Sequence, residues 1–77
     1  MNTAKIFRIM VRANDPDSSV IDLLDINSFA AAHDYDEAHN VEVYCFYYPD
    51  YVPNFLLDKL ENSEMEYSLG LVPHFYA

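Results

Sequence analysis

The alternating pattern of residues 4–13 predicts a strand in a sheet with one buried face. Apolar side chains alternate there with longer ones, so that Phe7, Ile9 and Val11 fall on one face and Arg8, Met10 and Arg12 on the other. A period of two is typical of a half-buried strand, because successive side chains point to opposite faces. Another element of the chain must therefore cover the apolar face.

Two later segments also predict strands. Residues 41–48 are β-branched and aromatic, and they end at Pro49 and Asp50, which stop a strand. In residues 64–71, apolar side chains alternate with polar or small ones up to Pro73. We expect the residues after Pro73 to form a short tail or an edge strand.

The segments between the strands have helical features. Asp15 suits a helix cap and Pro16 the first helical position, and Val20 and Leu24 repeat at helical spacing. We expect helix over residues 19–38, with a break near 25–27. The alternative is a turn or extended piece at 20–26, followed by a shorter helix that Asn27 or Ser28 caps.

The last interval predicts a second helix. Asp50 is its expected cap, Pro53 lies in its first turn, and residues 62–63 end it; its apolar stripe comprises Val52, Phe55, Leu56 and Leu60. The 77 residues thus predict one α+β domain in the order β-α-β-α-β. We expect a sheet of three strands, or four, with two helices on one face.

The charge of the chain is strongly one-sided. It has 4 basic and 13 acidic residues, a net charge of −9, and Lys5, Arg8 and Arg12 are three of the four cations. Residues 13–77 alone sum to 1 − 13 = −12. The excess carboxylates repel one another in a compact state, and the net negative charge disfavours direct binding to nucleic acid or to anionic membranes. We therefore expect a basic partner.

The sequence gives no sign of secretion. Cys45 is the single cysteine, so an internal disulfide is excluded, and the first residues lack the apolar core of a signal peptide. No apolar run approaches the ~18 residues of a membrane span. We expect a cytoplasmic protein in which Cys45 is a small core residue.

The segment from His33 to His39 is the densest group of candidate metal ligands. His33 and Glu37 would share a helix face, but the segment matches neither a zinc signature nor a calcium loop. The chain also lacks a glycine-rich phosphate loop and a Ser/His/Asp order. We therefore expect no enzymatic activity, no cofactor and no bound metal.

Acidic rows and tyrosines are the candidate binding residues. Exposed tyrosine is a frequent interface residue because it offers a large contact area with few rotors, and three tyrosines gather at the end of the 41–48 strand. We expect Arg8 and Arg12, in the strand at residues 4–13, to pair with Glu42, Glu64 or Glu66 on neighbouring strands. The predicted partner-binding residues are Asp15, Asp17, Asp22, Asp25, Asp34, Tyr35, Asp36, Glu37, Tyr47, Tyr48 and Tyr51.

In size, acidity, acidic rows and compact α+β pattern, the chain resembles small phage-encoded counter-defence proteins. These include anti-CRISPR inhibitors and DNA-mimic antirestriction proteins. The resemblance is one of composition and carries over no individual functional residue. It implies a non-enzymatic inhibitor of a basic nucleic-acid-binding protein or ribonucleoprotein complex, with an acidic surface that imitates nucleic acid. The alternative is a general interaction domain that forms a homodimer through its tyrosine-rich strand.

Overall fold

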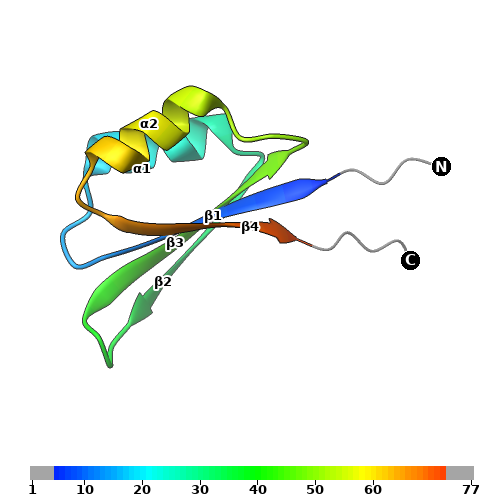
Figure 1. Ribbon diagram of the computed structural model, residues 1–77. Helices are drawn as coiled ribbons and strands as arrows, with labels where there is room; N and C mark the ends of the chain where they lie inside the picture. Colours follow the sequence, from blue (N-terminus) through cyan, green and yellow to red (C-terminus); the bar gives the residue numbers. More distant parts are fainter. Residues whose placement is uncertain (1–4, 73–77) are drawn as a thin grey trace, which may run out of the picture.

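Two helices cover one face of a four-stranded antiparallel sheet (Figure 1). The structure is a computed structural model, and it describes residues 5–72. The elements in chain order are β1 (Ile6–Ala13), α1 (Ser18–Asn27), β2 (Ala30–Asp36), β3 (Val41–Pro49), α2 (Asn54–Asn62) and β4 (Glu66–Val72). The predicted α+β class, with both helices on one face, is confirmed, and the sheet has the fourth strand.

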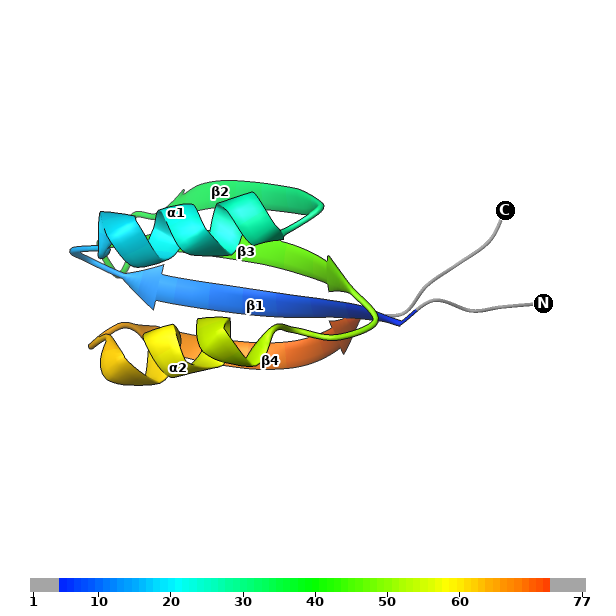
Figure 2. The ribbon, with the colours of Figure 1, turned by 90° about the horizontal axis from the view of Figure 1, so that it is seen from above.

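The sheet interleaves the two halves of the chain. Its strand order is β2-β3-β1-β4, and every neighbouring pair is antiparallel. The order β-α-β-β-α-β with this pairing is the ferredoxin-like, or split βαβ, arrangement. Seen from above, α1 lies over the side of β2 and β3, and α2 lies over the side of β4 (Figure 2).

The core lies between the sheet and the helices. Ile9 of β1 is paired with Phe46 of β3 and Leu69 of β4, so these three side chains share the helix-covered face. α1 and α2 each contribute two buried residues at helical spacing. The buried core consists of Ile9, Val11, Val20, Leu24, Phe46, Tyr48, Leu56 and Leu60.

The other face of the sheet has no helix over it in the part of the chain described here, and we name it the open face (Figure 1). The alternate residues of β1 and β3 point to it, with Met10 paired to Cys45 and Arg8 to Tyr47. Cys45 is half-buried on this face rather than in the core. The prediction of a core cysteine is therefore wrong, because Cys45 alternates with the buried Phe46.

Residues 30–36 form β2 and not the predicted continuation of a helix. α1 ends where the Ser28 amide donates to the Asp25 carbonyl at 3.1 Å and Ser28 takes an extended conformation. The Phe29 amide then donates to the Tyr47 carbonyl at 2.9 Å, and residues 30–36 continue along β3. Pairing with β3 outweighs the intrinsic preference of the three alanines in this segment for helix.

Both predicted helix caps are also wrong. The cap of α1 is Asp17, which follows Asp15 by two residues. α2 begins after Pro53 without a side-chain cap, and Asp50 has a positive φ of 67°, a value at which Asp and Asn are enriched. The predictions for residue 4 and for residues 73–77 lie outside the described residues.

Candidate functional site

α1 presents its acidic residues beside a hydrophobic anchor. Val20 and Leu24 are buried, whereas Asp22 and Asp25 are exposed. Residues three apart on a helix are neighbours, with about 5–6 Å between their Cβ atoms. α1 therefore carries a pair of adjacent carboxylates.

Asp17 has a structural role at the start of α1. Its Oδ1 accepts hydrogen bonds from the Ser19 hydroxyl at 2.7 Å, the Ser19 amide at 3.1 Å and the Val20 amide at 3.4 Å. These hydrogen bonds, the Ser19 hydroxyl first, hold the pKa of Asp17 below its usual value. The carboxylate is thus engaged within its own chain.

A groove runs along α1, between the helix and the β2–β3 pair. One hollow of about 260 Å³ is lined by residues that include Ile21, Asp25, His33 and Tyr44. A second, of about 390 Å³, shares Ile21 and Tyr44 and is lined also by Asp22 and Glu42. The two hollows share two lining residues and therefore adjoin one another along α1; we name them together the α1 groove.

A small residue in β2 makes room for the groove. Ala31 lines it on the same strand face as His33, and its side chain leaves little bulk beneath the helix. Its floor is apolar and aromatic, with Ile21, Tyr44 and Phe46 among the lining residues. The groove therefore combines an apolar floor with a carboxylate rim.

The far wall of the groove is a histidine–carboxylate pair. His33 Nε2 lies 2.6 Å from Glu42 Oε1, and the His33 ring packs edge-on against Tyr44, with 4.2 Å between the ring centroids. Within residues 5–72, no lysine or arginine forms an ion pair with Asp22, Asp25 or Glu42. The carboxylates of Asp22 and Asp25 are thus available to a partner, whereas Glu42 is in contact with His33.

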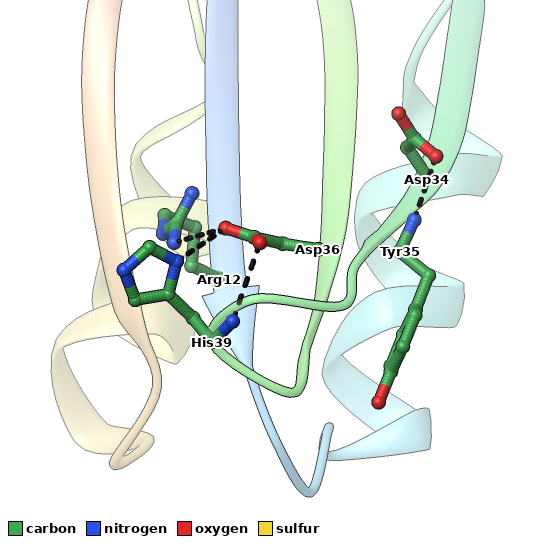
Figure 3. A network of polar contacts seen from close by, with 5 residues as sticks. All are labelled: Arg12, Asp34, Tyr35, Asp36 and His39. Carbon is green, nitrogen blue, oxygen red and sulfur yellow. Dashed lines mark hydrogen bonds and ion pairs between the residues drawn. The ribbon is translucent and has the colours of Figure 1, made fainter.

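The second predicted acidic row consists of Asp34, Asp36 and Glu37, and Asp36 in it is paired with a cation. Asp36 Oδ2 lies 3.1 Å from Arg12 Nη2 and 2.8 Å from His39 Nδ1 (Figure 3). These contacts, the His39 hydrogen bond first, lower the pKa of Asp36. Arg12 thus pairs with Asp36, and not with the predicted Glu42, Glu64 or Glu66.

The sheet separates the two predicted acidic rows. Asp34 and Asp36 are paired with Val43 and Val41 in the β2–β3 register, which puts them on the open face. Asp22 and Asp25 lie on the helix side. One continuous acidic patch over residues 15–37 is therefore not formed, although Asp15 and Glu37 are exposed in the loops.

The three tyrosines near the end of β3 do not form one surface. Tyr47 faces the open side, Tyr51 is 70% exposed, and Tyr48 is 1% exposed in the core. The Tyr48 hydroxyl donates to the Leu24 carbonyl at 2.7 Å, so the prediction of Tyr48 as a binding residue is wrong. Burial, and then the charge of Asp25, raise its pKa well above the usual range.

Tyr35 is exposed on the same side of β2 as the groove. It alternates with Asp34 and Asp36 and shares the face of Ala31 and His33. Its side chain is 44% exposed, and its hydroxyl donates to the Asn40 side chain. Asp34 accepts the Tyr35 amide at 2.8 Å (Figure 3).

Sequence reasoning missed Glu42 and Tyr44 as groove residues. Both alternate with Val43 and share a strand face with the buried Phe46. This alternation was visible in the sequence, but the face covered by helix was not. His33 is likewise in a strand, so the predicted helical His33–Glu37 pair is wrong, and its partner is Glu42.

Within residues 5–72, no group of three or more His, Cys, Asp or Glu residues is arranged to hold a metal ion. No helix in the same range has the length and apolar character required to cross a membrane.

Comparison with protein-family models, with curated protein sequences and with solved structures gives no match.

Proposed function

We propose that this protein is a non-enzymatic inhibitor of a basic nucleic-acid-binding protein or ribonucleoprotein complex, which it binds in the cytoplasm. The observation that carries the proposal is the α1 groove: Asp22, Asp25 and Glu42 line a depression with an apolar floor and have no lysine or arginine partner within residues 5–72. Lysine and arginine side chains that normally contact phosphates would meet these carboxylates.

The groove suits a partner segment that is both basic and apolar. Arginine binds carboxylate and phosphate with the same forked geometry, so a carboxylate can occupy a phosphate position. Charge pairing speeds encounter and sets specificity, whereas burial of apolar side chains against Ile21 and Tyr44 slows dissociation. Tyr35 adds an aromatic contact beside the groove. The partner's own nucleic acid and this protein therefore compete for one surface.

Competition is the direct test. The tagged chain is used to capture its partner from the cell that produces it, and the purified partner is then titrated with its nucleic acid. We expect mutually exclusive binding, and an affinity for this protein that falls as salt rises. A partner that binds both at once, or an affinity that is the same at low and high salt, contradicts the proposal.

A pair of double variants locates the contact. Asp22→Asn with Asp25→Asn removes two groove charges, and Asp50→Asn with Asp58→Asn makes the same change in net charge after β3 and on α2. We expect the first pair to weaken binding about tenfold or more, which is about 1.4 kcal/mol. The second pair should change it by less than about threefold. Equal losses would show that net charge, and not the groove, attracts the partner.

A further inference from the structure

The open face differs from an ordinary solvated sheet face. An antiparallel sheet with one wet side usually places polar residues there. Here every outward residue of β3 is apolar or weakly polar, and Met10 of β1 lies beside them. The outward residues of β3 are Val41, Val43, Cys45, Tyr47 and Pro49. β3 and Met10 thus present an apolar band to the outside, and Arg8 and Arg12 of β1 lie on either side of Met10.

The band has a polar border. Asp34 and Asp36 of β2 lie along one side, and Glu66 and Ser68 of β4 lie along the other. An apolar centre within a polar rim is the usual anatomy of a protein–protein interface. Both arginines of β1 also lie on this face.

The charge of the open face is close to neutral. Its strand residues carry Arg8 and Arg12 against Asp34, Asp36 and Glu66, which sum to 2 − 3 = −1. The remainder of the chain then carries −9 + 1 = −8. Two copies of so acidic a protein repel each other least when they approach through this face.

Arg8 is a cation without an acid partner. Its guanidinium lies over Gly70, where an added Cβ would be 3.7 Å from Nη2. Its Nε is buried and has no hydrogen-bond partner, and no carboxylate pairs with it within residues 5–72. On the same face, Asp34 and Glu66 have no lysine or arginine partner in that range. One face therefore carries unpaired charges of both signs, as a self-complementary two-fold interface requires.

We propose that two copies of this protein associate through their open faces. Four strands spaced by ~4.8 Å and about eight residues long cover on the order of 500 Å² in projection, and more as accessible surface. A standard interface buries roughly 800 Å² per partner. The face has the area of a small dimer, in which Arg8 meets a carboxylate of the second copy and both α1 grooves stay outside. The proposal does not depend on the proposed inhibitory function.

Sedimentation equilibrium of the full chain over a range of concentrations tests the association. We expect a monomer–dimer equilibrium, and Tyr47→Glu should raise its dissociation constant about tenfold or more. Ile26→Glu is the matched control, because Ile26 is 78% exposed on α1 and the change in charge is the same. Circular dichroism confirms that both variants fold. A monomer at all concentrations, or a dimer that only Ile26→Glu weakens, overturns the proposal.

Cys45 provides a second test on the unmodified chain. It is the single cysteine and lies on the open face, so its reaction with a charged thiol reagent should slow as the protein concentration rises. A dimer in which Cys45 reacts equally fast at every concentration overturns the proposal. The proposal is also overturned if the monomer binds a single-stranded RNA oligonucleotide and Tyr47→Glu abolishes that binding. Variants of the α1 groove should leave the dissociation constant unchanged, which separates this proposal from the inhibitory one.

Discussion

The two faces of the sheet are built from alternate residues of the same strands, yet they have different roles. Ile9, Phe46 and Tyr48 lie under α1 and α2 and are buried. Met10 and Tyr47 are their direct neighbours in sequence, and on the open face they are only half-buried. Hydrophobicity differs little between the two sets. The placement of the helices, and not the composition of the strands, decides which face holds the monomer together.

The largest expected contrast between the faces is in packing. Leu24→Ala creates a cavity in the core, and we expect it to lower the free energy of unfolding by about 2–5 kcal/mol. Val43→Ala on the open face should lower it by less than about 1 kcal/mol at concentrations where the chain is monomeric. Urea denaturation monitored by circular dichroism measures both values. Similar losses would mean that the open face is packed as tightly as the core.

Two neighbouring tyrosines give a smaller contrast. Tyr48→Phe removes the 2.7 Å hydrogen bond to the Leu24 carbonyl and leaves that acceptor buried, which should cost about 1–3 kcal/mol. Tyr47→Phe removes a hydroxyl without a hydrogen bond in the described residues and should change stability by less than about 0.5 kcal/mol. Thermal unfolding at low protein concentration tests the difference. A larger loss for Tyr47→Phe would reverse the assignment of the two faces.

The pH dependence of stability gives the smallest contrast, and its direction differs between the faces. The pKa of Asp36, on the open face, is lowered from 3.8. The ionised carboxylate therefore contributes fully to the stability of the fold above pH 3.8, and this contribution is lost as the pH falls below that value. The pKa of the buried Tyr48 is raised from 10.0, so its contribution is present below pH 10.0 and is lost as the pH rises above it.

Melting temperatures across the pH range separate these two groups. Asp36→Asn should reduce the loss of stability at acid pH, with a remainder from Asp17, whose pKa is also lowered. Tyr48→Phe should reduce the loss at alkaline pH. If Asp36→Asn leaves the fall in melting temperature at acid pH unchanged, the contacts with Arg12 and His39 contribute nothing to folding.

The sequence predicted the elements whose side chains alternate between two environments. β1 and α2 each have buried residues at the expected period, and their positions are confirmed within a few residues. The position of β4 is also confirmed, although none of its residues is buried, because its apolar and polar residues alternate in the sequence. β2 was missed because it is an edge strand whose residues are nearly all exposed, so burial imposes no period on it. Its alanines also favour helix in the absence of tertiary contacts.

The candidate site was harder to predict for the same reason. Asp22 and Asp25 were recognised from their helical spacing, but Glu42 reaches the α1 groove only because β3 turns that face toward α1. Apart from Glu42, residues 41–48 are apolar or aromatic on both faces, so the alternation does not show which tyrosine is buried. The partition of Tyr47 and Tyr48 is a property of the assembled layers.

The strand order has a consequence for the integrity of the chain. β1 and β2 belong to the first half of the sequence but are separated by β3, and β3 and β4 are separated by β1. Neither half contains a pair of adjacent strands, so each half alone would leave every strand without its neighbours. The loop between β2 and β3 is therefore a natural cut point: a chain severed there consists of two complementary fragments, each of which supplies the missing template for the other.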